Sequence, residues 1–334
     1  MPQTEMRALA FEGPAADTSR TRVLKLPVPD PAEGQVLIEV AYSGVNFKDV
    51  MVRRGDPGYA PSWPVVPGLE VAGTVRAVGH GVSGFSVGDV VAALTNAGGL
   101  AEFAVADSAL TAKVPAGVPL SVAAVAPGVL TTAELLLSTF ARVRAGDVIV
   151  VHSAGGAVGE AVAALSRSLA MVTLVGVTGS RERAAAALRS GYDASFVRTD
   201  GLADAVRSHL DGRGADVILD PQGTEWLSED LELIAPGGRI VLFGNAGGDE
   251  LSPLPAAGVL FGKNAAVGGF SLAALSKSQP AEIGAALRRV LAQLANGTVS
   301  PQVSVVRGLD AAAEPQQLLA EGKGVGKYVI EVAG

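Results

Sequence analysis

A glycine-rich turn between a strand and a helix constrains the fold of this chain more than any other segment. Residues 150–159 read VVHSAGGAVG, so a β-branched run leads through small residues into an apolar helical pattern. The spacing matches G-x-G-x-x-G with Ala154 in the first place, then Gly156 and Gly159. Such a turn brings backbone N–H groups at a helix start close to a phosphate. The alternative is a tight turn that binds no ligand.

The segments after residue 147 favour the ligand-binding reading, because strand and helix patterns alternate there. Alternation of this kind predicts a parallel sheet covered by helices on both faces, which is a doubly wound Rossmann fold. We expect strands at 148–151, 172–177, 194–197, 215–219, 239–243 and 265–270, and helices at 158–169, 181–190, 202–210 and 225–234.

The first third of the chain has a different pattern. Short β-branched runs at 36–40, 71–75 and 87–91 lie between glycines and prolines, which predicts a small barrel or sandwich. Residues 121–140 and 283–296 have helical patterns. The last apolar run, at 327–332, is expected to return to the first domain as a strand.

Composition narrows the function classes. The chain has 334 residues, enough for two domains with a core each, and a formal net charge of −7, which argues against a nucleic-acid partner. It has no cysteine, which excludes disulfides, thiolate zinc ligands and a cysteine nucleophile. We see no N-terminal signal pattern and no uninterrupted apolar run of roughly 18 residues, so we expect a cytoplasmic protein without a membrane span.

The end of the second predicted strand should select the cofactor. NAD sites usually carry an acidic residue about 20 residues after the glycine turn, where it binds the ribose 2′-hydroxyl. Here the segment holds Thr178, Ser180, Arg181 and Arg183 and no acid at the strand end. Guanidinium and hydroxyl groups suit a 2′-phosphate, so we expect NADPH. The alternative is that both arginines are solvated side chains in the first turn of a helix.

An ordered series of motifs resembles a known family. The segments are GVNFKD at 44–49, PGLEVAG at 67–73, LTTA at 130–133, PGGR at 236–239, FGN at 243–245 and GK at 326–327. The series is similar to zinc-independent medium-chain dehydrogenases/reductases of the quinone oxidoreductase and enoyl reductase type. The resemblance implies an α/β chain with a GroES-like β-barrel domain at 1–121 and 300–334, and a Rossmann domain at 122–299.

The resemblance also implies hydride transfer from NADPH to a quinone or an activated carbon–carbon double bond. Zinc members of the wider family carry His where this chain has Leu69, and a metal-binding Cys near Ser43. We therefore expect no catalytic metal.

Candidate site residues follow from the turn and from the resemblance. Asn46 is the candidate for holding a substrate carbonyl, with its amide donating to the developing negative charge. Tyr59 is the candidate proton donor, although it could equally be an apolar wall, and solvent could supply the proton. The residues expected to bind the cofactor are Ser153, Gly155, Gly156, Ala157, Val158, Gly159, Thr178, Ser180, Arg181 and Arg183, with Thr131, Phe243, Gly244, Asn245, Gly269, Phe270 and Lys327 added by the resemblance.

Other polar residues receive structural or open assignments. His152 reads as a satisfied core histidine, and Asp49 as the N-cap of the helix that begins there. The roles of Asp220 and Gln222, at the carboxyl end of a predicted strand, stay open.

Several functions compete with quinone or enone reduction. The closest is reduction of an enoyl thioester on coenzyme A or a carrier protein, for which Arg53 and Arg54 hint at a basic rim. A non-catalytic NADPH-binding protein is another, because Met51 stands where several relatives carry Tyr. A tailoring enzyme whose net reaction is not reduction is a third. The resemblance further implies a homodimer formed through the sheet edge at 265–272.

Overall fold

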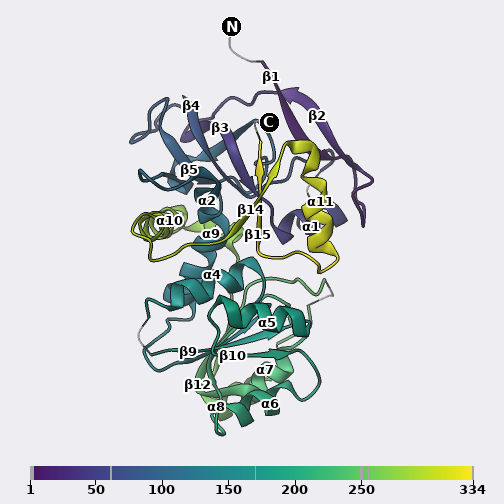
Figure 1. Cartoon of the computed structure of the whole chain (residues 1–334), viewed down its shortest axis with the longest axis vertical. Helices are drawn as coiled ribbons and strands as arrows, with labels where there is room; N and C mark the ends of the chain where they lie inside the picture. The colour runs from purple at the N-terminus through teal and green to yellow at the C-terminus, as the bar shows by residue number, and fades with distance from the viewer. Residues whose placement is uncertain (1–3, 61, 170, 249–250, 255, 333–334) are drawn as a thin grey trace. The chain divides into compact units, whose positions relative to one another are not determined.

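The computed structural model describes residues 4–60, 62–169, 171–248, 251–254 and 256–332 (Figure 1). Contacts between Cα atoms divide the chain into two compact units, Met1–Thr131 with Ala273–Gly334, and Thr132–Leu272. The domain limits expected from the sequence, 1–121 with 300–334 and 122–299, stay a prediction.

The first unit is built on antiparallel strands. Its larger sheet has the order β14-β15-β3-β4-β5-β7, with β6 paired to β3, and a separate hairpin joins β1 and β2. The strands are β1 (Glu5–Phe11), β2 (Thr21–Pro27), β3 (Gln35–Gly44), β4 (Glu70–Val78), β5 (Val90–Leu94), β6 (Phe103–Asp107), β7 (Thr111–Lys113), β14 (Val303–Arg307) and β15 (Lys327–Glu331). β15 pairs antiparallel with β3, so the predicted return of the last strand is confirmed.

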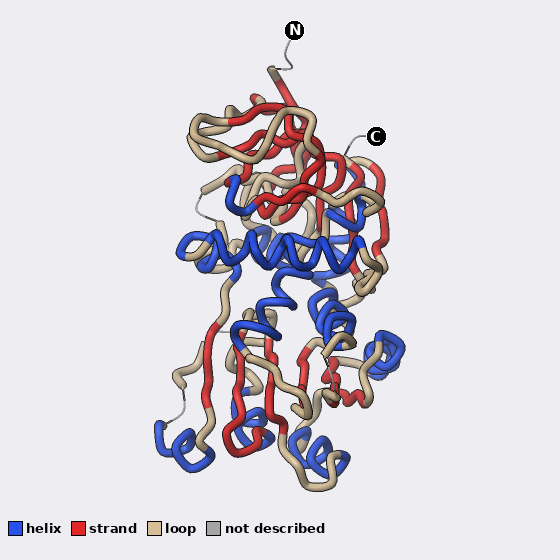
Figure 2. The backbone as a smooth tube through the Cα atoms, turned by 90° about the vertical axis from the view of Figure 1, so that its left-hand side faces the viewer, coloured by secondary structure: helices blue, strands red, loops and turns tan. Residues whose placement is uncertain are grey.

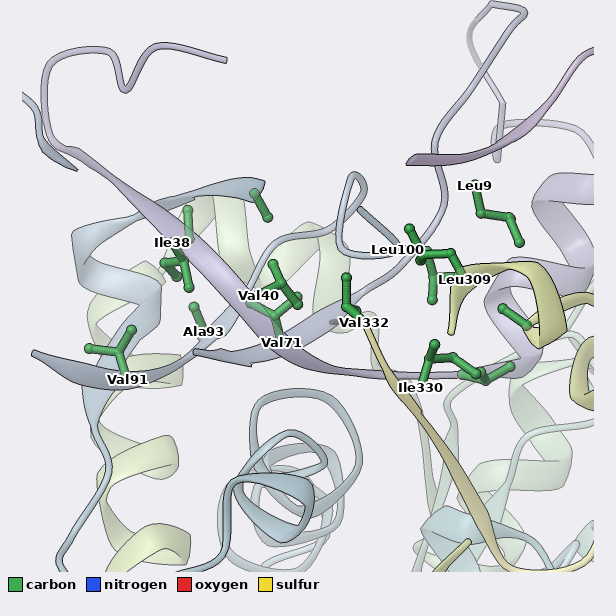
Figure 3. Close-up of a cluster of buried hydrophobic side chains, with 14 of the residues drawn as sticks. Leu9, Ile38, Val40, Val71, Val91, Ala93, Leu100, Leu309, Ile330 and Val332 are labelled. Atoms are coloured by element: carbon green, nitrogen blue, oxygen red, sulfur yellow. The ribbon is translucent and has the colours of Figure 1, made fainter. Parts of the chain in front are cut away.

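The core of this unit gathers apolar side chains from segments far apart in the sequence. Figure 3 shows the cluster, to which β3 contributes Ile38 and Val40, β4 contributes Val71 and β15 contributes Ile330, all nearly or fully buried. These strands are buried or partly buried over most of their length, and Arg76 is their one exposed position. The packing holds β15 against β3 and therefore places the start of β15 beside the end of β3.

The predicted strand at 87–91 begins later than expected, at Val90. Gly88 has a φ of +94°, and the Asp89 carboxylate accepts a hydrogen bond from the Ser86 N–H, so residues 86–89 form a turn instead. Five further strands were not predicted: β1, β2, β6, β7 and β14. β6, β7 and β14 have only three to five residues, and β1 and β2 carry charged residues between their apolar ones.

The predicted helix at 121–140 is interrupted. It consists of α2 (Leu120–Ala123), a π-helical turn (Ala126–Leu130), α3 (Thr131–Leu135) and a second π-helical turn (Leu136–Phe140). Pro127 has no N–H to give, and the N–H of Gly128 donates to the Glu70 carboxylate at 2.7 Å instead of to the helix. Leu120–Phe140 is long and apolar enough to span a membrane by composition, yet 78% of its most apolar window is buried inside the protein, as in a core helix.

Helices of the first unit flank the antiparallel sheet. They are α1 (Phe47–Arg54), α9 (Leu272–Ser278), which crosses from the second unit at its first residue, α10 (Pro280–Ala295) and α11 (Ala313–Ala320). α1 follows directly on β3, so the end of the central strand leads into the first turn of this helix.

The second unit contains a six-stranded parallel sheet in the order β10-β9-β8-β11-β12-β13, whose strands run side by side (Figure 2). Its elements are β8 (Val148–His152), β9 (Thr173–Thr178), β10 (Ala194–Val197), β11 (Ala215–Asp220), β12 (Ile234–Leu242) and β13 (Ala266–Gly269), with α4 (Ala157–Ser166), α5 (Arg181–Ser190), α6 (Leu202–His209), α7 (Leu227–Leu233) and α8 (Ala257–Lys263). The order reverses between β8 and β11, which is the doubly wound arrangement. The predicted fold class is therefore confirmed, with strand and helix ends shifted by a few residues.

Candidate functional site

The glycine-rich turn lies at the carboxyl end of β8, where the strand order reverses. Ser153 adopts a φ of +57°, and the N–H of Gly156 donates to the Ser153 carbonyl at 2.8 Å. A Cβ on Gly159 would lie 2.5 Å from the Ala154 carbonyl oxygen, so only glycine fits this position. α4 begins directly after Gly156, and the N–H groups of its first turn lack intrahelical acceptors. The turn therefore offers free backbone N–H groups to an anionic ligand, and phosphate binding by these residues stays a prediction.

The start of α5 lies close to this turn. Thr178 ends β9, and Ser180 caps α5 by accepting the Arg183 N–H at 3.3 Å. A Cβ on Gly155 would meet the Arg183 carbonyl oxygen at 3.3 Å and the Arg183 Cβ at 3.5 Å. Arg183 therefore lies beside the glycine turn, while Arg181 is exposed at the start of α5. No acidic residue ends β9, so the strand end presents hydroxyl and guanidinium groups.

The segments expected to face the nicotinamide lie at the carboxyl ends of β12 and β13. The Phe243 N–H donates to the Asp220 carbonyl, and a Cβ on Gly244 would lie 2.8 Å from the Pro221 carbonyl oxygen. The Phe270 N–H donates to the Leu242 carbonyl at 2.8 Å. Since parallel strands end at one edge of the sheet, the residues at 243–245 and 269–270 share that edge with the glycine turn.

A buried cluster of charged residues, His152, Asp220 and Asp230, lies next to the glycine-rich turn. His152 Nε2 lies 2.9 Å from an Asp230 carboxylate oxygen, and both residues are fully buried. Burial would lower the pKa of His152, but the charges of Asp230 and Asp220 raise it. Burial raises the pKa of Asp220 to about 6. His152 is therefore a core histidine that pairs with Asp230, and the charge of the nearby Asp220 also acts on it.

Potential ligand atoms of His152, Asp220 and Asp230 lie within 4.8 Å of one another, a spacing open to a metal ion. The guanidinium of Arg198 also acts on both carboxylates, and it lies 5.6 Å from the centre of the Trp226 ring. The positive charge of Arg198, and that of His152 when it is protonated, offset the carboxylate charges of Asp220 and Asp230. We therefore interpret the cluster as a structural one, in which opposite charges offset one another at the carboxyl edge of the sheet.

Gln222 connects the charged cluster to the glycine turn. Its backbone N–H donates to Asp220 at 2.7 Å, and its side-chain amide donates to the Ser153 hydroxyl at 2.7 Å. Arg198 donates to the Gln222 side-chain oxygen at 3.4 Å. The open question about Asp220 and Gln222 is thus answered in part, because they orient the turn. Sequence reasoning missed Arg198, whose only signal was a charge at the end of a strand.

In the first unit, Asn46 and Lys327 meet at a buried carboxylate. Lys327 Nζ lies 2.7 Å from Glu70 Oε1, and it donates to Asn46 Oδ1 at 2.7 Å and to the Val45 carbonyl at 2.8 Å. The Asn46 amide donates to Glu70 Oε1 at 3.1 Å and to the Gly44 carbonyl at 3.2 Å. Both amide hydrogens of Asn46 are therefore engaged within the protein. Sequence reasoning missed Glu70, although the residue stands inside the PGLEVAG segment.

Asn46, and not Asp49, is the N-cap of α1, so the expected capping role of Asp49 was wrong. Asp49 is the third residue of the helix, and its carboxylate accepts the Asn46 N–H at 2.8 Å and the Gly68 N–H at 3.0 Å. Burial raises the pKa of Asp49 against these two hydrogen bonds. The two residues form a reciprocal cap that fixes the start of α1 at the end of β3.

Tyr59 and Thr131 lie outside this network among the residues that the structure describes. Tyr59 is half-buried and packs against the core cluster of Figure 3, and burial raises the pKa of its hydroxyl. This packing supports the apolar-wall alternative, and the role of Tyr59 as proton donor stays a prediction. The Thr131 hydroxyl is fully buried and donates to the Ala126 carbonyl at 2.8 Å.

The basic rim suggested by Arg53 and Arg54 is not formed. Arg53 is 1% exposed and donates to the Ala16 carbonyl, while Arg54 pairs with Asp56 at 2.6 Å. The helix packing that buries Arg53 could not be read from the two adjacent arginines.

Comparison with known proteins adds an independent observation. The alcohol dehydrogenase GroES-like domain matches residues 32–116, and the zinc-binding dehydrogenase domain matches residues 157–292. Quinone oxidoreductase of Sus scrofa is 31% identical over 328 residues, covering 97% of this chain and 96% of the relative. The synaptic vesicle membrane protein VAT-1 homolog-like of Homo sapiens is 28% identical over 348 residues, covering 98% and 81%. The solved structure of mycobacterial Rv1454c complexed with NADPH has a TM-score of 0.87 at 27% identity, covering 98% and 99%.

Proposed function

The chain belongs to the medium-chain dehydrogenase/reductase family, and from this premise we propose that it is an NADPH-dependent oxidoreductase that reduces a quinone or an activated carbon–carbon double bond without zinc. The observation that carries the proposal is the glycine turn at the carboxyl end of β8, with Arg183 beside it and no acid at the end of β9. The named similarity to Sus scrofa quinone oxidoreductase supports the acceptor class.

The residues of the second unit fit NADPH. The N–H groups at the start of α4 would hold the pyrophosphate, and Gly156 would let the backbone approach it. Gly159 lets α4 pack closely on Ala154. Ser180, Arg181 and Arg183 would hold the 2′-phosphate, because hydroxyl and guanidinium groups donate to phosphate oxygens. Thr178 and the residues at 243–245 and 269–270 would line the rest of the cofactor site in the second unit. Thr131, Asn46 and Lys327, which the resemblance also nominated, belong to the first unit. When bound, NADPH supplies the hydride.

The reduction is proposed to proceed without zinc. The chain has no cysteine, and Leu69 stands where zinc members of the family carry His. An aliphatic side chain offers no ligand atom, so the chain lacks both the His and the Cys with which zinc members of the family bind the metal. In place of a Lewis acid, hydrogen-bond donors must stabilise the oxygen that gains negative charge.

Two alternatives keep specific support. An enoyl thioester is also an activated double bond, so the same site chemistry would reduce it, although the missing basic rim removes the hint of a carrier protein. A non-catalytic NADPH-binding protein is compatible with the similarity to a human protein that is named for a vesicle membrane.

The proposed enzyme is a cytoplasmic homodimer. β13 is an edge strand of the parallel sheet, and Phe261 on the neighbouring α8 is 77% exposed. An unpaired edge next to an exposed aromatic residue is a surface that a second copy could cover. Sedimentation of the purified protein as a monomer would contradict this part of the proposal.

The test of the cofactor assignment is a titration of the purified protein with NADPH and with NADH, followed by nucleotide fluorescence. Tight NADPH binding with much weaker NADH binding supports the proposal. Equal binding of the two nucleotides would remove the 2′-phosphate argument, and binding of neither would favour a protein that does not use NADPH.

A further inference from the structure

Gln222 joins the end of β11 to the glycine-rich turn. Its side-chain amide donates to the Ser153 hydroxyl at 2.7 Å, across 69 residues of sequence. Its backbone N–H donates to the Asp220 carboxylate at 2.7 Å, which fixes the backbone from which the side chain starts. Gln222 is 8% exposed, so the protein encloses its amide. All three residues belong to the second unit, and Ser153 is part of the turn that is proposed to bind the dinucleotide.

Arg198 determines which end of the Gln222 amide meets Ser153. Its Nη1 atom donates to the amide oxygen of Gln222 at 3.4 Å. A guanidinium donates hydrogen bonds and accepts none, so the amide oxygen and not the amide nitrogen must face it. The charge of Asp220 acts on this guanidinium, whose central carbon lies 5.6 Å from the centre of the Trp226 ring. The NH₂ group of the amide is therefore turned to Ser153.

The direction of this contact determines the role of the Ser153 hydroxyl. A hydroxyl has one hydrogen to donate and lone pairs that accept. Because Ser153 Oγ accepts from the Gln222 amide, its own hydrogen stays available for another acceptor. Within the part of the chain that the structure describes, no acceptor takes this hydrogen. Ser153 is half-buried, so a bound molecule can reach it.

The hydroxyl lies in the same short turn as the free N–H groups at the start of α4. The Ser153 carbonyl accepts the N–H of Gly156 at 2.8 Å, and Gly156 is the N-cap of α4. Ser153 has a φ of +57°, which side chains rarely adopt, so the turn is held in one particular conformation. A phosphate that accepts from the N–H groups of this helix start would therefore lie beside the residue that carries the hydroxyl.

We propose that the Ser153 hydroxyl donates to a pyrophosphate oxygen of the bound dinucleotide, and that Gln222 is the positioning residue that keeps this hydroxyl a donor. The inference rests on the proposed function, because it takes the turn to be the pyrophosphate site. Phosphate oxygens accept charge-assisted hydrogen bonds, so they match a hydroxyl whose oxygen already accepts from an amide. NADPH and NADH share the pyrophosphate. The contact therefore adds affinity for both nucleotides and does not select between them.

Ser153→Ala and Gln222→Met test the contact in fluorescence titrations with NADPH and with NADH. Ser153→Ala removes the hydroxyl and should weaken binding of both nucleotides by the same factor, about 10- to 100-fold, as for a hydrogen bond to a charged group. Gln222→Met removes the amide and leaves the hydroxyl free to rotate, so both affinities should fall by roughly 2- to 10-fold. A loss confined to NADPH would place the hydroxyl at the 2′-phosphate and overturn the pyrophosphate contact.

The double variant separates positioning from a general effect on the turn. If Gln222 acts through the hydroxyl, Gln222→Met should add no further loss of affinity once Ser153→Ala is present. A further loss in the double variant would overturn the positioning role. Gln317→Met is the matched control, because Gln317 on α11 donates to Glu321 at 2.9 Å in the first unit, and its loss should leave nucleotide binding unchanged. Urea unfolding of the nucleotide-free variants shows whether each one is folded.

Phosphorus NMR of bound NADPH gives a readout that a loss of stability would not change. The pyrophosphate and the 2′-phosphate give separate resonances. Ser153→Ala should shift the pyrophosphate resonances of the bound nucleotide and leave the 2′-phosphate resonance in place, whereas Arg183→Ala should do the reverse. Pyrophosphate resonances that keep their wild-type positions in Ser153→Ala would overturn the contact.

Failure of the inference can be told from failure of the proposed function. A wild-type protein that binds NADPH, with the same affinity in Ser153→Ala and in Gln222→Met, would overturn the hydroxyl contact and leave the cofactor assignment intact. A wild-type protein that binds neither nucleotide would overturn the proposed function and the inference together.

Discussion

The ion pair between Lys327 and Glu70 is expected to hold the start of α1 in place. Its charged atoms lie 2.7 Å apart, and the two residues are 4% and 0% exposed. Lys327→Met keeps most of the apolar stem but removes three hydrogen bonds, to Glu70, Asn46 and Val45. Of the donors in the described residues, the Glu70 carboxylate would then keep the Asn46 amide and the Gly128 N–H.

The magnitude follows from the burial of the pair. Removing one partner of a buried ion pair leaves an uncompensated charge and lowers the free energy of unfolding by about 3–5 kcal/mol. Glu70→Gln leaves the Lys327 ammonium buried without its counter-ion, so it should lower the free energy of unfolding by a similar amount. The double variant removes both charges. Its loss in free energy of unfolding should therefore be smaller than the sum of the two single losses, by roughly 0.5–3 kcal/mol.

Urea unfolding followed by circular dichroism would measure these differences. Lys323→Met is the matched control, because Lys323 and Glu321 are 2.8 Å apart but 70% and 40% exposed. Exposed ion pairs contribute little, so the control should unfold like the wild type. The reasoning is refuted if Lys327→Met also unfolds like the wild type, or if the two single losses add up in the double variant.

Three further results are expected. Arg183→Ala should weaken NADPH binding by about 10- to 100-fold in fluorescence titrations, because hydrogen bonds to charged groups contribute about 1.5–3 kcal/mol. NADH binding should stay unchanged. An equal loss of NADPH binding in Arg189→Ala, at the far end of α5, would refute a local contact with Arg183. Gly159→Ala places a Cβ 2.5 Å from the Ala154 carbonyl oxygen and should lower the free energy of unfolding by about 1–3 kcal/mol, whereas Gly258→Ala, where a Cβ meets nothing within 4 Å, should not. The pKa of Asp220 is raised from 3.8 to about 6, so between these pH values the folded protein holds a proton that the unfolded chain has released. The free energy of unfolding should therefore fall by on the order of 3 kcal/mol as the pH rises through this window. In Asp220→Asn the free energy of unfolding should no longer fall with pH in this window, and an unchanged fall would assign it to another group.

The sequence was sufficient for most of the second unit. Parallel strands that are buried on both faces read as continuous apolar runs, and glycine turns and amphipathic helices separate them, so β8 to β13 were all predicted. The interrupted segment at 120–140 was not predicted, because its break depends on a distant partner. The Glu70 carboxylate accepts the Gly128 N–H across 58 residues of sequence.

In the candidate site, too, local features could be predicted and contacts between distant residues could not. The glycine turn is local, so its residues could be named from their spacing alone. The engagement of the Asn46 amide could not be foreseen, because Lys327 is 281 residues away in sequence and reaches Asn46 only through the pairing of β15 with β3. For the same reason two adjacent arginines suggested a rim, although the folded chain buries Arg53.

NADPH-dependent reduction without a metal is tested most directly by dialysing the protein against a strong chelator and following the nicotinamide absorbance with a quinone and with an enone as acceptors. We expect NADPH to be oxidised in the presence of an acceptor, and turnover to be unchanged by removal of metal. Activity that disappears with the chelator and returns with added zinc would contradict this expectation.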